Sequence, residues 1–158
     1  MTPQQRQGLR WKSHEFDEYF NHPGHHGGMT DTGLTIGRAA ELTGLTADTL
    51  RYYERDGLML APVARAATGH RRYTEGDLAW VQLVTRLRAT GMPIRDVRRY
   101  AALVRSGPGN EEARLELLRG HRRLVLDQLA EVESHLEAID YKIGLYEGTV
   151  DAARRATA

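Results

Sequence analysis

The chain has 158 residues, a length that suggests one domain or one small domain with an extension. Its 22 basic and 21 acidic side chains give a formal net charge of +1, which argues against a uniformly basic nucleic-acid coat protein and an acidic tail protein. It contains no cysteine, which excludes disulfides, thiolate metal sites and a cysteine nucleophile. Because we find no long apolar run and no secretory signal, we expect a soluble, cytoplasmic protein.

The average charge hides an uneven distribution along the chain. Residues 34–105 hold twelve basic side chains, all of them arginine, and seven acidic ones, a net charge of +5. Residues 1–33 carry three basic and four acidic side chains (net −1), and residues 106–158 carry seven and ten (net −3). The planar guanidinium group of arginine can form two hydrogen bonds with a phosphate or with guanine. The middle segment therefore modestly favours a nucleic-acid partner over solvated helix faces, the commoner reason for surface charge.

Residues 1–33 are predicted to be a flexible N-terminal extension. The stretch from His22 to Gly28 is too rich in glycine and proline to form a regular element. His22, His25 and His26 lie close together in it, a composition that can bind metals. Because the stretch has neither an ordered scaffold nor a suitably spaced carboxylate, we expect no metal site, and nothing elsewhere in the chain predicts a cofactor.

The segment over residues 34–60 predicts two short helices joined by a tight turn. Thr35 is a good N-cap for the first helix, Gly44 fits the left-handed position that ends it, and Thr46 caps the second. Two short helices joined by about four residues that include a glycine have helix-turn-helix geometry. A plain helical hairpin is the alternative.

The second of these helices is the one expected to contact DNA. Leu50, Tyr53 and Leu58 would pack inward. The outward side chains can bond phosphates or base edges. They are Thr49, Arg51, Tyr52 and Arg55.

A short hairpin is predicted next. Pro62 breaks the preceding helix, and the Thr-Gly pair at 68–69 can turn a hairpin. Arg65 precedes this turn, and Arg71 and Arg72 follow it. A hairpin with arginines beside a DNA-reading helix is a winged helix, in which the arginines would hold backbone phosphates.

Two further helices are expected before the clearest boundary in the chain. Residues 74–77 resemble a capping box that opens one helix, and Pro93 starts the next. The Gly-Pro-Gly run at 107–109 cannot continue a helix. We therefore place the DNA-binding domain at residues 34–106 and a linker at 107–110.

The last third of the chain predicts one long helix with a heptad repeat. From Val125 to Tyr146 the apolar residues are spaced by alternating steps of 4 and 3. A single helix cannot bury such a stripe, so we expect a coiled-coil dimerisation helix over residues 111–147 and a flexible C-terminal tail over 148–158. Packing against the helix's own N-terminal module is the alternative. The stripe comprises Leu118, Val125, Leu129, Val132, Leu136, Ile139, Ile143 and Tyr146.

In combination, these segments resemble the MerR family of bacterial transcription regulators, over about residues 34–147. The residues that carry the resemblance are Thr35 to Ala40, Thr49 to Leu58, Gly69 to Tyr73 with Asp77 and Leu78, and Leu87 to Ile94.

The resemblance implies a mainly α-helical protein, with a winged helix-turn-helix module followed by an antiparallel coiled-coil dimer. It implies binding to double-stranded promoter DNA with an overlong spacer, which the dimer bends and untwists so that RNA polymerase engages both promoter elements. Such a regulator would be associated with the nucleoid. By position, the helix contacts to DNA would come from Arg38, Thr49, Arg51 and Tyr52. The wing contacts would come from Arg65, His70, Arg71 and Arg72.

Two departures from the family bear on the effector. Metal-sensing members bind metal through cysteines, and this chain has none. Drug-sensing members carry a ligand domain after the coil, whereas here only residues 148–158 follow it. A small apolar effector would then bind between the coil and the DNA-binding module, or there is no effector.

Two other function classes are considered. One is an architectural DNA-bending protein with little sequence specificity. The other is a ligand-binding regulator with a pocket at the junction of the coil and the DNA-binding module. An enzyme is not expected, because the sequence has no nucleophile–base set, no glycine-rich phosphate loop and no metal-ligand spacing.

Overall fold

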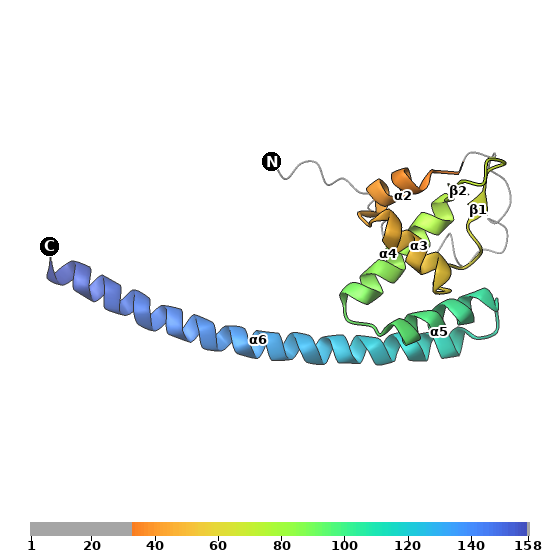
Figure 1. Cartoon of the computed structure of the whole chain (residues 1–158). Coiled ribbons are helices and arrows are strands. Elements are labelled where there is room, and N and C mark those ends of the chain that lie inside the picture. Colours follow the sequence, from red (N-terminus) through yellow and green to blue (C-terminus); the bar gives the residue numbers. More distant parts are fainter. Residues whose placement is uncertain (1–32, 158) are drawn as a thin grey trace. The chain divides into compact units, whose positions relative to one another are not determined.

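The computed structural model describes residues 33–157, which fold mainly into helices, as the sequence predicts (Figure 1). The predicted N-terminal extension, with its three histidines, lies outside the described residues apart from Gly33. In chain order the elements are α2 (Ile36–Thr43), α3 (Ala47–Arg55), β1 (Ala64–Arg65), β2 (Arg71–Arg72), α4 (Glu75–Ala89), α5 (Ile94–Arg105) and α6 (Glu111–Ala156).

The chain divides into two compact units, one up to Arg114 and the other from Leu115 onward. The first unit contains α2 to α5, the small sheet and the first turn of α6. The second unit is the remainder of α6. None of the helices in residues 33–157 is both long and apolar enough to span a lipid bilayer. Within the same residues, no three His, Asp or Glu side chains gather as metal ligands would.

Helices α2 and α3 form the predicted helix-turn-helix because both of their starts are capped. The Thr35 hydroxyl accepts a hydrogen bond from the Arg38 amide at 3.3 Å, and the Thr46 hydroxyl accepts one from the Thr49 amide at 3.1 Å. Gly44 ends α2 with φ at 71°, a conformation that costs a residue with a Cβ about 1–2 kcal/mol. The chain therefore reverses tightly there, and α2 packs on both α3 and α4.

The core of the first unit lies beneath α3 and α4. Leu50, Tyr53 and Leu58 are buried, as predicted. Trp80 of α4 is also buried, and its indole nitrogen donates to the Leu58 carbonyl at 2.6 Å. Its ring stacks on Tyr100 of α5 with centroids 5.8 Å apart. Trp80 therefore joins α4 both to the loop after α3 and to α5.

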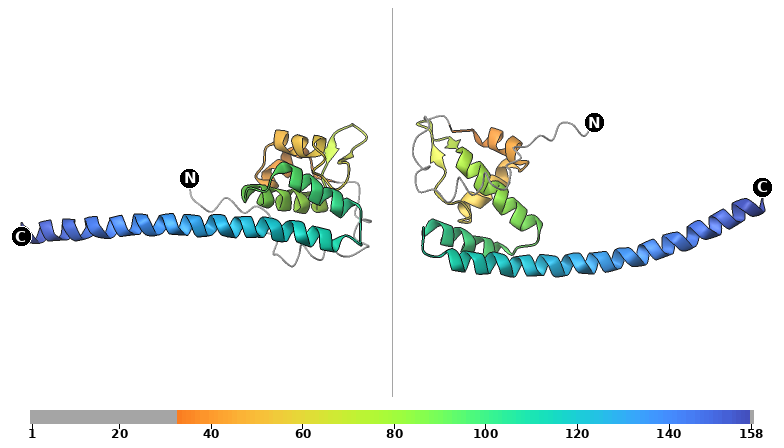
Figure 2. Two further views of the ribbon diagram at one scale, coloured as in Figure 1. Left: turned by 90° about the horizontal axis from the view of Figure 1, so that it is seen from below. Right: turned by 180° about the vertical axis from the view of Figure 1, so that it is seen from behind.

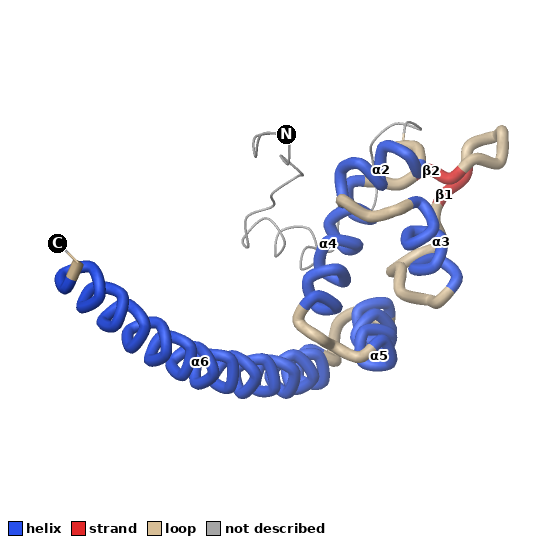
Figure 3. The backbone as a smooth tube through the Cα atoms, turned by 60° about the vertical axis from the view of Figure 1, so that its left-hand side comes forward, coloured by secondary structure: helices blue, strands red, loops and turns tan. Residues whose placement is uncertain are grey.

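The predicted wing is present as a very short hairpin. Strands β1 and β2 pair antiparallel, with Ala64 opposite Arg72 and Arg65 opposite Arg71. Figure 3 shows both strands at the base of a loop that projects away from the helices. At the open end of the hairpin, Tyr73 and Leu34 exchange two backbone hydrogen bonds of 2.8 and 2.9 Å. The wing is thereby tied to the segment that precedes α2.

Helix α4 starts with the predicted capping box. The Thr74 amide donates to the Asp77 carboxylate at 2.8 Å, and the Asp77 amide donates to the Thr74 hydroxyl at 3.1 Å. Pro93 occupies the N-cap of α5, where its missing N–H costs no helical hydrogen bond. The capping residues in the sequence therefore predicted the starts of both helices.

Two arginines of α5 attach that helix to the end of α3. Arg105 donates to the carbonyls of Gly57 and Met59 at 2.9 and 2.8 Å. Arg98 forms an ion pair with Asp56, the C-cap residue of α3. The C-terminal end of α3 is consequently held by α5 as well as by the core.

Helix α6 is longer than predicted and runs without interruption to Ala156 (Figure 2). The predicted helix end at 147 is wrong, and residues 148–156, predicted as a flexible tail, are helical. A single glycine such as Gly148 costs a helix only about 1 kcal/mol. The Ala-Ala-Arg-Arg-Ala run at 152–156 has high helix propensity and outweighs that cost.

Candidate nucleic-acid interface

Helix α3 presents the first group of side chains predicted to contact DNA. Arg51 is exposed, and its Nη1 lies 2.6 Å from Oδ1 of Asp48, one turn earlier. Thr49 is half-buried, with its hydroxyl oxygen 2.9 Å from that of Thr46. The exposed Arg51–Asp48 ion pair, whose residues are three positions apart on the helix, contributes only about 0.2–0.5 kcal/mol. A phosphate can therefore replace Asp48 as the partner of Arg51 at little cost.

Tyr52 and Arg55 lie next to each other on α3. Tyr52 is half-buried, and the guanidinium carbon of Arg55 lies 5.9 Å from the centroid of its ring. Tyr53 is buried, which separates the core face of the helix from its outer face. On α2, Arg38 is exposed, and its Nη1 lies 2.7 Å from Oε2 of Glu41.

The wing arranges its predicted contact residues on two faces. Successive side chains of a strand point to opposite faces, so Arg71 and Arg72 point apart. Arg72 is half-buried, and its Nη1 lies 3.5 Å from the Gly33 carbonyl oxygen, at the base of the wing. His70 is exposed in the wing loop. Arg65 and Arg71, which face each other across the strands, share the other face.

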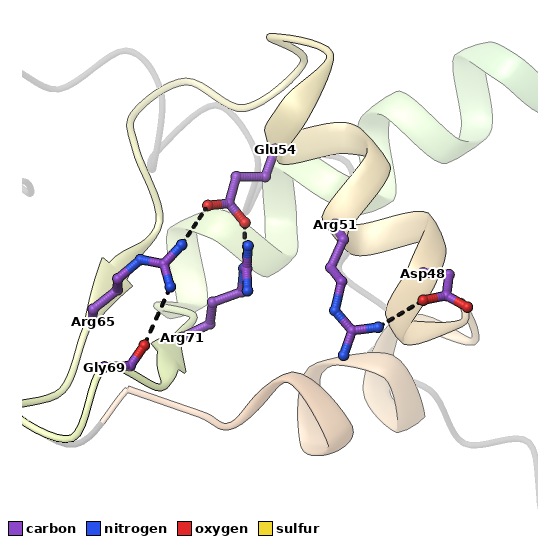
Figure 4. Close-up of polar contacts among 6 residues, drawn as sticks. All are labelled: Asp48, Arg51, Glu54, Arg65, Gly69 and Arg71. Atoms are coloured by element: carbon purple, nitrogen blue, oxygen red, sulfur yellow. Dashed lines mark hydrogen bonds and ion pairs between the residues drawn. The ribbon is translucent and has the colours of Figure 1, made fainter.

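Glu54 of α3 joins both of these wing arginines to the helix (Figure 4). Its Oε2 accepts a hydrogen bond from Nε of Arg71, and its Oε1 lies 3.5 Å from Nη2 of Arg65. The Glu54 side chain is 20% exposed and that of Arg71 is 28% exposed. Glu54 was not among the predicted site residues, because the register that places Arg65 opposite Arg71 cannot be read from spacing alone.

The electrostatic effects of this cluster follow from those contacts. The hydrogen bond with Glu54 raises the pKa of Arg71, which keeps this side chain charged. Burial raises the pKa of Tyr73, and the negative charge of Glu54 adds to the rise. At neutral pH Arg71 is therefore charged and the Tyr73 phenol is neutral.

A half-open cavity of about 190 Å³ lies where the start of α2, α3 and the wing come together. It brings together three side chains that the sequence placed in separate segments: Arg51 from α3, and His70 and Arg71 from the wing. Thr35, Ile36 and Gly69 complete its lining. Three of its lining residues, Arg51, His70 and Arg71, carry N–H groups of the kind that bonds phosphate.

The residues of the predicted apolar stripe lie along α6, and none of the helix's residues is buried. Leu129, Val132, Leu136, Ile139, Ile143 and Tyr146 are each about half exposed or more, whereas Leu118 and Val125 are partly covered. The longer helix adds Val150, which continues the alternating spacing and is also exposed. An exposed apolar stripe of this length is typical of a surface that contacts another protein segment.

Comparison with known proteins gives a consistent result. The family described as MerR HTH family regulatory protein matches residues 34–103. An uncharacterized HTH-type transcriptional regulator of Haemophilus influenzae is 38% identical over 113 residues, which cover 72% of this chain and 83% of the relative.

Two solved structures are similar along most of their length. A putative MerR family transcriptional regulator from Listeria monocytogenes aligns with a TM-score of 0.73 and 35% identity, covering 78% of this chain and 92% of that one. HiNmlR, described as a MerR family regulator lacking the sensor domain and bound to promoter DNA, aligns with a TM-score of 0.64 and 38% identity. That alignment covers 72% of this chain and 89% of HiNmlR.

Proposed function

The chain belongs to the MerR family of helix-turn-helix transcriptional regulators, and on that premise we propose that it is a dimer that recognises one promoter and reshapes it. The relatives are transcriptional regulators and not enzymes. The observation that carries the proposal is the cavity in which Arg51 of α3 meets His70 and Arg71 of the wing. A regulator bound to promoter DNA is among the structures most similar to this chain.

We infer that α3 enters the major groove and that the wing lies along the adjacent backbone. Arg51 is exposed on α3, and Thr49 and Tyr52 are half-buried there; we expect all three to contact base edges or phosphates. Arg55 and Arg38 would add phosphate contacts at the ends of this surface. Lys is absent from residues 33–114, so all of these cationic contacts depend on guanidinium groups, which bind phosphate with two parallel hydrogen bonds.

The apolar stripe of α6 supports dimerisation through this helix, in the antiparallel arrangement that the family resemblance implies. Two protomers would then present two copies of α3 to two half-sites, so the operator would be an inverted repeat. Contacts at both ends of an overlong spacer allow the dimer to bend and untwist the DNA between them. The sequence of that spacer sets the cost of this deformation, which is indirect readout. RNA polymerase would then engage both promoter elements.

The test is binding to a duplex from the region upstream of the chain's own gene. Fluorescence anisotropy with the full chain should show binding that weakens steeply as salt rises and that an unrelated duplex competes poorly. Arg51→Ala should weaken binding at least about tenfold. It should also lower the salt slope, which is the steepness of log K against log salt concentration, by about one ion. Arg154→Ala, on the exposed last turn of α6, removes the same charge elsewhere and should leave binding unchanged.

Two results would contradict the proposal. Failure to bind the upstream duplex at low salt would refute promoter recognition. Equal competition by the unrelated duplex would instead identify an architectural DNA-bending protein.

A further inference from the structure

The wing holds two like charges directly opposite each other. Arg65 and Arg71 are register partners in the antiparallel pair, so their side chains leave the same face a few ångströms apart at the backbone. Like charges in this position destabilise a strand pair. Glu54 forms an ion pair with each of them.

The hairpin itself offers little resistance to that repulsion. Each strand has only two residues, and a hairpin this short is marginal by itself, even though the Leu34–Tyr73 bridge extends it at its open end. The residues of the loop between the strands are mostly exposed. Arg65 also donates from Nη1 to the Gly69 carbonyl at 3.2 Å, so the guanidinium that contacts Glu54 also closes the wing turn.

We propose that Glu54 is a positioning residue that sets DNA specificity by holding Arg65 and Arg71 in one arrangement against α3. This inference rests on the proposed DNA-binding function. It follows from the position of the half-buried Glu54 carboxylate, which contacts both facing arginines (Figure 4). Nε of Arg71 donates to Glu54, and this hydrogen bond fixes the direction in which the rest of the guanidinium points. The wing and α3 then meet DNA as one surface.

A negative charge on a DNA-facing surface also lowers binding to every duplex. Glu54 partly neutralises two arginines that would otherwise bind the backbone phosphates of any duplex. Non-specific affinity depends on the number of phosphates that cations neutralise. Glu54 therefore reduces non-specific binding more than it reduces binding to the operator, where the arginines are needed in the held arrangement.

The experiment compares Glu54→Gln with Asp48→Asn across a series of salt concentrations. Both variants remove one negative charge from an ion pair on α3, but the Asp48 side chain is 91% exposed and pairs within the helix. For Glu54→Gln we expect tighter binding to an unrelated duplex, with a salt slope larger by about one to two ions. We also expect the preference for the promoter duplex to fall about fivefold to tenfold. Asp48→Asn also frees an arginine, Arg51, but leaves the wing held against α3, so it should lower the preference less than Glu54→Gln does.

A second measurement needs no DNA. Because the chain has no cysteine, Thr68→Cys provides a single spin-label site in the exposed wing loop. The label should become more mobile in the Glu54→Gln background and not in the Asp48→Asn background. Adding Arg65→Gln to Glu54→Gln should remove part of the gain in non-specific binding, since it removes one released cation.

The outcomes separate the two proposals. Unchanged label mobility, or equal effects of the two variants on duplex preference, would overturn the role of Glu54. If the wild-type chain bound neither duplex, the proposed function would fail, while label mobility would still decide whether Glu54 holds the wing. Circular dichroism of each variant verifies that the helices remain folded.

Discussion

Replacing Trp80 with phenylalanine should destabilise the first unit markedly. The side chain is 1% exposed, its indole nitrogen donates to the Leu58 carbonyl at 2.6 Å, and its ring stacks on Tyr100. Phenylalanine keeps an aromatic ring but has no donor and is smaller. The substitution therefore removes one hydrogen bond and opens a small cavity at the point where α4, α5 and the loop after α3 meet.

The magnitude follows from these two losses. A buried carbonyl left without its donor costs about 1–3 kcal/mol. Phenylalanine lacks two of the buried ring carbons of tryptophan, at about 0.8 kcal/mol for each carbon. The free energy of unfolding should therefore fall by about 3 kcal/mol. This is a large part of the total of about 5–15 kcal/mol that is typical of a domain.

Urea denaturation followed by far-ultraviolet circular dichroism measures this change. Wild type and variant are compared at one protein concentration, because the proposed dimerisation would make apparent stability depend on concentration. Tyr141→Phe is the control, since that aromatic side chain on α6 is 68% exposed and its substitution should change stability by less than about 0.5 kcal/mol. A loss below about 1 kcal/mol for Trp80→Phe with an unchanged slope would refute the assigned role of the Trp80–Leu58 contact.

Two further predictions concern the core and α6. The buried Tyr73 hydroxyl has no hydrogen-bond partner among residues 33–157, so Tyr73→Phe should raise the free energy of unfolding by about 1 kcal/mol near neutral pH, measured by urea denaturation. Because burial raises the pKa of Tyr73, the folded state keeps the phenol neutral, and the wild-type chain loses stability as pH rises from the ordinary phenol pKa of about 10 through the raised value. The variant should lack that alkaline loss, and an equal loss in both proteins would contradict the assignment. Leu136→Asp should convert the proposed dimer to a monomer in sedimentation analysis, whereas Leu145→Asp, off the apolar stripe, should not; dimers in both variants would exclude the stripe as the interface.

The sequence by itself determined the features that depend on neighbours along the chain. The caps at Thr35, Thr46 and Thr74 were readable because a capping bond joins residues only three positions apart. Gly44 was readable because a left-handed helix end favours glycine. The apolar spacing on α6 was also readable, but its end was misplaced, because Gly148 favours a helix end and the high helix propensity of residues 152–156 outweighs it.

Only the tertiary structure decided the features that join distant segments. Glu54 and Arg71 are 17 positions apart, and Trp80 and Leu58 are 22 apart. No periodicity within one helix encodes either pairing. Likewise, the sequence did not indicate which of the predicted arginines lie close together, and only the fold places Arg51 and Arg71 around one cavity. The physical reason is that local backbone preferences act over a few residues, whereas an ion pair between a helix and a wing exists only after packing has brought the two together.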